Sequence, residues 1–247
     1  MRKCDSYDFD HDNRLMCYDR FYLYRMRWIY EERYKVIRVI IELKDACKII
    51  KGITVLDHIS YELKDNRVYG LQGPNGSGKS MLIRAICGLI HLTSGQVIID
   101  GKVVGKEIEF PESVGLLLER PAFLGEYSGF DNLKMIAAIQ GKVNDDMIRS
   151  AIEEVGLDPN DKKKYRKYSL GMKQRLGIAG AIMMEPKLLI LDEPTNALDV
   201  DGIALVRDII GKRIQKGRII IIASHDREEM ERITDEVLYM KAGRLLR

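Results

Sequence analysis

The sequence predicts an α/β fold in which strands form a parallel sheet and a helical lobe is inserted between them. Three observations support this prediction. Short apolar segments of strand length recur along the chain, and one of them, residues 67–73, leads directly into a glycine-rich loop and a helical pattern. Residues 129–166 are mainly helical in pattern and separate the earlier strands from the later ones. Strand–loop–helix units with such an insertion are typical of an α/β core.

The composition suits a globular protein with a sizeable core. The 247 residues are 46% hydrophobic and 31% charged, and a formal net charge of +3 is too close to balance to indicate a nucleic-acid binder. Cys4, Cys17, Cys47 and Cys87 show no CxxC spacing, so we expect reduced thiols in a cytosolic protein rather than disulfides or a metal site.

No apolar run reaches the roughly 18 residues that a membrane span needs. The N-terminal region is studded with Asp and Arg and carries no secretory signal. If the protein works at a membrane, we expect another chain to cross it.

Residues 1–38 differ in character from the rest of the chain. Tyrosines are interleaved there with Asp and Arg, and no period of 2 or 3.6 is sustained. We expect a flexible extension or a segment that precedes the native start, and the alternative is a regulatory or docking arm. The folded domain is expected to occupy residues 39–247.

The first half of this domain shows strand patterns around one helix. Ile59, Tyr61 and Leu63 alternate with polar neighbours, as in a half-buried strand. Asn66 stands at a turn, where Asn tolerates a positive φ better than most residues. Strands are expected at residues 39–50, 58–65, 67–73, 95–100 and 113–118, and a helix from residue 81 that ends near Gly88.

The second half of the domain begins helical and returns to strands. Either Asn144 or Asp145 is a plausible helix cap. Helices are expected at residues 129–140, 145–157 and 199–215, and strands at residues 187–192, 218–224 and 236–246. The helical lobe is expected at about residues 120–184.

A phosphate-binding loop is predicted at "GPNGSGKS", which matches G-x-x-x-x-G-K-[ST] between an apolar strand and a helix. The glycines let the backbone wrap a phosphate with its N–H groups inward, and the helix N-terminus adds positive potential. Lys79 supplies charge for the β and γ phosphates, and the Ser80 hydroxyl can ligate Mg²⁺. The alternative is an ordinary glycine-rich turn with an exposed lysine. The predicted nucleotide-binding residues here are Gly73, Pro74, Asn75, Gly76, Ser77, Gly78, Lys79, Ser80 and Met81.

Two acidic residues follow the apolar strand at residues 187–192. The carboxyl end of a buried parallel strand opens onto the same crevice as the phosphate loop. We therefore predict that Asp192 lies on the Mg²⁺ side and that Glu193 orients and deprotonates an attacking water. The alternative is an ordinary strand end followed by a turn at Pro194.

His225 emerges at the end of another apolar strand, in "RIIIIASHD". A lone histidine at such a place is usually a loop residue. Beside a phosphate loop and an Asp-Glu pair, we predict that it contacts the γ-phosphate and holds the attacking water.

The ordered set GPNGSGKS, YSLGMKQR, LLILDEP, NALD and SH resembles the ATP-binding-cassette (ABC) ATPases, over about residues 39–247. The resemblance implies a P-loop NTPase core with a parallel sheet, an antiparallel β subdomain and a helical subdomain. It also implies ATP and Mg²⁺ as cofactors.

The resemblance further implies that two subunits share each nucleotide. YSLGM stands where the family carries LSGGQ, a stretch that faces nucleotide held by the opposite subunit of a head-to-tail dimer. Ser169 and Gly171 would then cap a second phosphate-binding helix, although Ser169 also suits a plain helix N-cap. Asp199, in NALD, would lie at the same interface between the two subunits.

This chain departs from the family pattern at several positions. Glu119 stands where a glutamine usually touches Mg²⁺ and the water; a carboxylate can also ligate Mg²⁺, and the alternative is a simple loop carboxylate. Ile49 or Ile50 stands where an aromatic residue usually stacks on adenine, so we expect weaker base selectivity. Leu170 replaces the first glycine of the signature.

The resemblance implies a cytoplasmic, membrane-peripheral subunit that hydrolyses ATP and drives a separate transmembrane permease. The permease would meet the helical lobe beside Glu119. The combination of YSLGM and Glu119 resembles exporters of drugs, peptides or lipid-like molecules more than nutrient importers. The ATPase subunits would form a homodimer or heterodimer, and no nucleic acid is expected.

Two alternatives belong to other classes. One is a soluble ABC ATPase outside transport, for example in cluster assembly. The other is a P-loop kinase or GTPase, which does not account for Ser169, Gly171 and His225.

Overall fold

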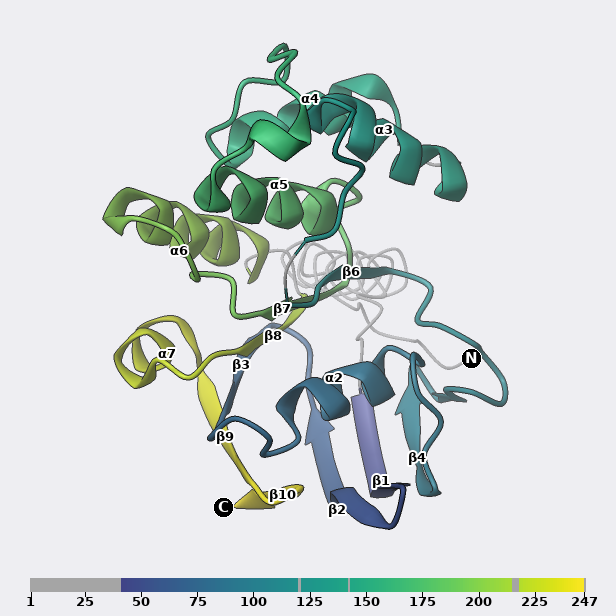
Figure 1. Cartoon of the computed structure of the whole chain (residues 1–247). Coiled ribbons are helices and arrows are strands. Elements are labelled where there is room, and N and C mark those ends of the chain that lie inside the picture. Colours follow the sequence, from purple (N-terminus) through teal and green to yellow (C-terminus); the bar gives the residue numbers. More distant parts are fainter. Residues whose placement is uncertain (1–40, 120, 142, 215–217, 247) are drawn as a thin grey trace, which may run out of the picture. The chain divides into compact units, whose positions relative to one another are not determined.

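The computed structural model describes residues 41–119, 121–141, 143–214 and 218–246 (Figure 1). The predicted extension, residues 1–38, lies outside them, so the division of the chain at Val39 stays a prediction. The described part contains two β-sheets and a set of helices. This arrangement confirms the predicted α/β class with a parallel sheet, an antiparallel sheet and a helical region.

The smaller sheet is antiparallel and has the strand order β2-β1-β4-β5. Its first two strands form a hairpin around Lys51 and Gly52, whose φ values of 49° and 80° are typical of a type I′ turn. Its strands are β1 (Ile41–Ile50), β2 (Ile53–Leu63), β4 (Ser94–Ile99) and β5 (Lys102–Val103).

The larger sheet has the order β10-β9-β3-β8-β7-β6 and is parallel apart from β10. Every residue of β7 and β8 is buried, which explains why both read as unbroken apolar runs. The strands are β3 (Arg67–Gln72), β6 (Val114–Leu117), β7 (Leu188–Asp192), β8 (Ile219–Ala223), β9 (Glu236–Lys241) and β10 (Arg244–Leu246).

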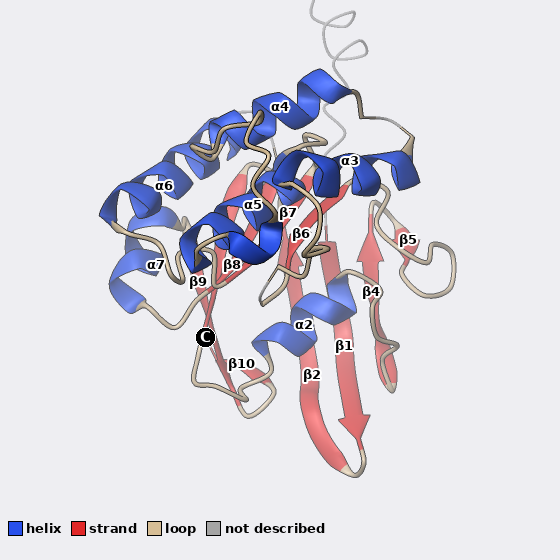
Figure 2. Ribbon diagram, turned by 45° about the horizontal axis from the view of Figure 1, so that its top comes forward, coloured by secondary structure: helices blue, strands red, loops and turns tan. Residues whose placement is uncertain are grey.

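The two faces of the larger sheet pack into different cores. Alternate residues of β7 divide between them: Leu189 and Leu191 join the core beneath the helices, and Leu188 and Ile190 join the core shared with the antiparallel sheet. Figure 2 shows the helices gathered on one side and α2 with the smaller sheet on the other. The helices are α2 (Lys79–Ile86), α3 (Gly129–Gln140), α4 (Asp145–Glu154), α5 (Leu170–Ile182), α6 (Val200–Ile214) and α7 (Arg227–Ile233), with a short 3₁₀ turn at Tyr165–Lys167.

Local capping signals explain where several helices begin. Ser128 accepts a hydrogen bond from the Asp131 amide at the start of α3, and Asn144 accepts one from the Met147 amide at the start of α4. Of the two candidates for the second cap, Asn144 is therefore the cap. The positive φ predicted for Asn66 is also confirmed, at 60°.

The structure corrects some of the expected boundaries. Helix α2 (Lys79–Ile86) begins at Lys79 rather than at residue 81. It ends close to Gly88, as expected, where Gly88 adopts a φ of 73° and its amide donates to the Ala85 carbonyl, as at a helix C-terminus. The strand expected at residues 236–246 is two strands that reverse at Ala242 and Gly243, both with positive φ. Helix α7 and strand β5 were not predicted.

Cys47 and Cys87 are free and buried, as expected; Cys4 and Cys17 lie outside the described residues. Burial raises the pKa of the Cys87 thiol to about 12.

Within the described ranges, each helix is too short or too polar to cross a lipid bilayer.

A buried ion pair joins α6 to α4 of the helical region. The Arg213 guanidinium is nearly inaccessible and donates to both carboxylate oxygens of Glu154, at 2.7 and 2.8 Å. These bonds hold the pKa of Glu154 below its ordinary value, although burial opposes the shift.

We expect Glu154→Gln to lower the free energy of unfolding by about 3 kcal/mol at pH 7, because it leaves a buried charge without its main partner. Since the folded-state pKa of Glu154 is depressed, its contribution is present above the unfolded pKa and lost as pH falls through the folded pKa. The difference between variant and wild type should therefore shrink in acid. Urea denaturation across pH measures both effects, and Glu153→Gln, at an exposed neighbour, is the matched control.

Candidate functional site

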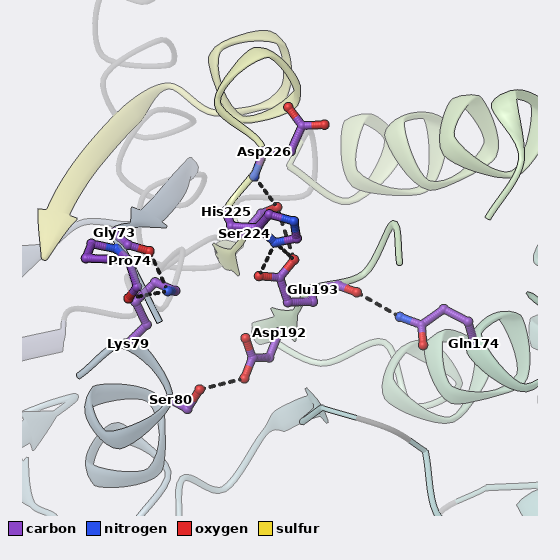
Figure 3. Close-up of polar contacts among 10 residues, drawn as sticks. All are labelled: Gly73, Pro74, Lys79, Ser80, Gln174, Asp192, Glu193, Ser224, His225 and Asp226. Atoms are coloured by element: carbon purple, nitrogen blue, oxygen red, sulfur yellow. Dashed lines mark hydrogen bonds and ion pairs between the residues drawn. The ribbon is translucent and has the colours of Figure 1, made fainter. Parts of the chain in front are cut away.

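Several of the predicted site residues, among them Lys79, Asp192 and Glu193, come together at the carboxyl edge of the larger sheet (Figure 3). Leu71 of β3 and Asp192 of β7 both pair with Ala223 of β8, so the three strands end at one level. The loop after β3 leads to Lys79, β7 continues into Glu193, and β8 leads to His225. Register alone therefore places these side chains beside one another.

The glycines of the phosphate loop occupy backbone conformations that other residues rarely adopt. Gly73, Gly76 and Gly78 have φ values of 154°, 77° and 108°. A Cβ at Gly73 would lie 2.2 Å from the Met240 carbonyl oxygen, and one at Gly78 would lie 2.8 Å from that of Val55. Among the described residues, no side chain caps the amides at the start of α2. The loop therefore presents free helix N–H groups to an anion.

Lys79 lies over this loop with only 7% of its surface exposed. Its Nζ donates to the carbonyl oxygens of Gly73, at 2.7 Å, and Pro74, at 3.3 Å (Figure 3). Backbone carbonyls thus hold a buried positive charge at the place where the motif predicts a phosphate.

Asp192 and Ser80 form the candidate metal-binding pair. Ser80 Oγ donates to Asp192 Oδ2 at 3.0 Å, and Asp192 is only 3% exposed. Burial raises the pKa of Asp192, the bond from Ser80 opposes the rise, and the charges of Glu193 and Glu119 add to it. A cation beside this carboxylate would offset its cost of burial.

The donor set fits Mg²⁺. A hydroxyl and a carboxylate are hard oxygen ligands, and Mg²⁺ is usually held by one or two carboxylates together with phosphates and waters. Over the described ranges, no group of three or more His, Cys, Asp or Glu side chains could hold a metal by itself. The site therefore suits a cation that arrives with phosphate.

Glu119 lines the same cavity but is engaged elsewhere. Arg84 Nη2 donates to Glu119 Oε1 at 3.0 Å, and the Glu119 backbone has a φ of 48°. Sequence reasoning gave no sign of this ion pair, because 35 residues separate its partners.

Glu193 and His225 face one another. His225 Nδ1 lies 2.9 and 3.0 Å from the two carboxylate oxygens of Glu193, and Ser224 Oγ lies 3.3 Å from one of them. Glu193 itself has a φ of 51°, a conformation that costs about 1–3 kcal/mol in a residue other than glycine. The pair can accept a proton at the carboxylate while the imidazole fixes its orientation.

The cavity at this edge has a volume of about 920 Å³. Among the described residues of the antiparallel sheet, Val55 lines this cavity. Ile49 and Ile50, which stand at the position expected to contact adenine, are partly exposed and do not line it. Its wall consists of Val55, Asn75, Gly76, Ser77, Gly78, Lys79, Ser80, Met81, Glu119, Pro121, Tyr165, Leu170, Lys173, Gln174, Asp192, Glu193, Asn196 and Ala197.

The residues expected to face a partner's nucleotide lie next to this wall without forming part of it in the described structure, although Leu170, between Ser169 and Gly171, does line the cavity. Ser169 accepts a hydrogen bond from the Met172 amide, so its interpretation as the N-cap of α5 is confirmed. A Cβ at Gly171 would lie 3.0 Å from the Ala197 carbonyl oxygen, which is a reason within one chain for a glycine there. In the described part of the chain, Ser169, Gly171 and Asp199 do not line the cavity.

Asp199 is held at the start of α6. Its Oδ1 accepts hydrogen bonds from the Gly202 amide, at 2.9 Å, and from Arg175, at 3.3 Å. The bond from the amide, with the nearby Arg175 charge, lowers the pKa of this carboxyl.

Sequence reasoning missed Gln174. This side chain is 6% exposed, and its Nε2 donates to the carbonyl oxygen of Glu193 (Figure 3) and to that of Pro194. The available signal was its spacing from Gly171, which places both on one helix face.

Comparison with known proteins gives a consistent result. A family model described as "ABC transporter" matches residues 56–196. The ABC transporter ATP-binding protein YybJ of Bacillus subtilis (strain 168) is 47% identical over 205 residues, covering 83% of this chain and 94% of that protein. The lantibiotic transport ATP-binding protein SrtF of Streptococcus pyogenes is 37% identical over 193 residues, covering 78% and 83%.

Solved structures share the fold. An ATP-binding subunit of an ABC transporter matches with a TM-score of 0.76 at 26% identity, covering 83% of this chain and 88% of that one. The dimeric structure of the bacterial ABC transporter cassette MJ0796 matches with a TM-score of 0.76 at 21% identity, covering 84% and 97%.

We expect Lys79→Met to weaken the binding of nucleoside triphosphates by roughly 30-fold or more, because truncating one partner of a buried charged contact typically costs at least about 2 kcal/mol. Titration with a fluorescent ATP analogue measures the change. Lys102→Met removes an exposed lysine that pairs with Glu112 outside the cavity wall, and it should leave affinity unchanged. Equal affinities for Lys79→Met and wild type would refute the assignment of the phosphate loop.

Proposed function

This chain belongs to the ABC transporter family and is one of its ATP-binding subunits, and we propose that it hydrolyses ATP to drive a separate permease that exports its substrate. One observation supports the catalytic part most directly. Lys79, the Ser80–Asp192 pair and Glu193 all line one cavity, and His225 contacts Glu193 although it is not among the described residues of the cavity wall. A buried ammonium, a hydroxyl and two carboxylates therefore face one cavity, and an imidazole contacts the second carboxylate.

The phosphate loop would bind the triphosphate. Backbone N–H groups at the start of α2 receive its oxygens, and Lys79 exchanges its contacts with Gly73 and Pro74 for the β and γ phosphates. The residues assigned to this binding are Gly73, Pro74, Asn75, Gly76, Ser77, Gly78, Lys79, Ser80 and Met81.

Ser80, Asp192 and Glu119 would hold Mg²⁺. When bound, Mg²⁺ supplies positive charge that neutralises the phosphate oxygens. Ser80 and Asp192 already lie together, whereas Glu119 would exchange Arg84 for the cation.

Glu193 would act as the general base. Its carboxylate takes the proton of the attacking water, and His225 Nδ1 holds that carboxylate in place. The other ring nitrogen of His225 is left for the γ-phosphate.

A second chain would complete each site. Near the N-terminus of α5, Leu170, Lys173 and Gln174 line this chain's own cavity, whereas Ser169 and Gly171 are not among the described residues that do. The Leu170 side chain is also exposed, so this end of the helix is accessible to a partner. Ser169 and Gly171 would donate to the γ-phosphate of the opposite subunit in a head-to-tail homodimer or heterodimer, with Asp199 at the same interface. The dimeric MJ0796 cassette supports this assembly. Hydrolysis would remove the contacts that join the chains.

The permease would be a separate chain, and this subunit would then lie at the cytoplasmic face of the membrane. A drug, peptide or lipid-like substrate fits the similarity to SrtF, whose name assigns it to lantibiotic transport. No observation favours the soluble, non-transport alternative.

We expect Glu193→Gln to reduce the rate of ATP hydrolysis by about 10²–10⁴-fold, because it removes the general base. ATP binding should persist, so dimers held by ATP should accumulate on size-exclusion chromatography. Glu228→Gln, at an exposed position on α7, is the control and should keep the wild-type rate. Normal hydrolysis by Glu193→Gln would remove Glu193 from this role.

The shared site predicts complementation between two defective chains. Alone, neither Lys79→Met nor Ser169→Arg should form dimers in the presence of ATP. In an equal mixture, both defects can fall in one site of a head-to-tail dimer and leave the other site intact. Chromatography with labelled ATP should therefore show dimers that carry one nucleotide per two chains. Absence of such dimers would contradict a head-to-tail homodimer.

A further inference from the structure

The segment that carries Glu193 lies along one face of α5. Gly171, Gln174 and Arg175 are spaced i, i+3 and i+4, so they share a face of this helix. Gly171 approaches the Ala197 carbonyl, Gln174 donates to the carbonyls of Glu193 and Pro194, and Arg175 donates to Asp199. Residues 193–199 are therefore attached to α5 at both ends and in the middle.

Gln174 is the contact nearest to the reacting groups. It is almost fully buried in a helix whose other buried residues are apolar or glycine. Buried amides need hydrogen-bond partners. Its Nε2 finds two, at 3.0 Å from the Glu193 oxygen and 3.1 Å from the Pro194 oxygen. The Gln174 amide thus forms hydrogen bonds with the backbone at and just after Glu193.

That backbone needs support. With a φ of 51°, Glu193 occupies the left-handed region, and such conformations persist only where neighbours hold them. The Glu193 amide donates to the Ala223 carbonyl on one side, and Pro194 has no N–H to offer on the other. Gln174 supplies side-chain donors on that second side. The direction of the Glu193 Cα–Cβ bond follows from this φ, so the turn aims the carboxylate at Ser224 and His225.

We propose that Gln174 is a positioning residue for the general base. It holds the left-handed turn at Glu193 and keeps the carboxylate in its productive direction. Because Ser169 begins the same helix, Gln174 also links the end of α5 that would meet a partner's nucleotide to the Glu193 turn. The inference rests on the proposed role of Glu193.

The first test removes the N–H donors of the amide. Gln174→Met keeps the length and burial and cannot donate, and Gln174→Glu keeps the shape but offers at most one O–H donor to the two carbonyls. We expect kcat to fall about 10²-fold in both, because a small misplacement of a catalytic group has an effect of that size. KM and the affinity for ATP should stay near wild type, and dimers held by ATP should accumulate. Lys134→Met, which removes an exposed ion pair between α3 and α4, should change none of these values.

The second test is a double-mutant cycle. If Gln174 acts only through Glu193, Gln174→Met should slow the single-turnover rate of wild type but not that of Glu193→Gln. Thermal melting of each variant separates a folding defect from a catalytic one. If Gln174→Met does not fold, the same cycle is run with Gln174→Glu.

Two outcomes would overturn the proposal. One is a folded Gln174 variant with wild-type kcat, and the other is a multiplicative loss when both substitutions are combined. The proposed function fails separately, if Glu193→Gln alone hydrolyses ATP at the normal rate.

Discussion

The register of the central parallel strands is the constraint on which the site depends. Leu71 of β3 and Asp192 of β7 pair with the same residue of β8, Ala223, so the three strands end level. A slip of one residue would turn each side chain to the opposite face of the sheet and displace the loop that follows. Because β7 and β8 are buried on both faces, close packing on each side resists such a slip.

The same sheet connects the site to the rest of the molecule. One face packs against α5, α6 and α7, and the other against α2 and the antiparallel sheet. Both groups reach the cavity, through Lys79 and Ser80 on α2 and through Leu170 and Gln174 on α5. A nucleotide bound at the edge would therefore contact elements from both cores. Displacement of either core would therefore change the contacts to the bound phosphates.

Three residues with strained backbone lie where chemistry is proposed. Glu119, Glu193 and Ala197 all have positive φ values and all line the cavity. Such conformations persist at functional sites when surrounding contacts impose them. At Glu193 these contacts come from β8 and α5, at Ala197 the close neighbour is Gly171, and Glu119 pairs with Arg84. The reactive carboxylate is thus held by elements distant in sequence.

The sequence alone determined the features whose causes are local. Strands β7 and β8, the loop at residues 73–80 and helix α3 follow from apolar runs, glycine spacing and end signals, and both ends of α3 fall where Ser128 and Gly141 place them. Tertiary structure decided the Arg84–Glu119 pair, the attachment of residues 193–199 to α5 and the reversal at Gly243 between β9 and β10. These features depend on which segments, distant in the sequence, lie next to one another in the fold. Sheet order and helix packing determine that, and local residue spacing does not.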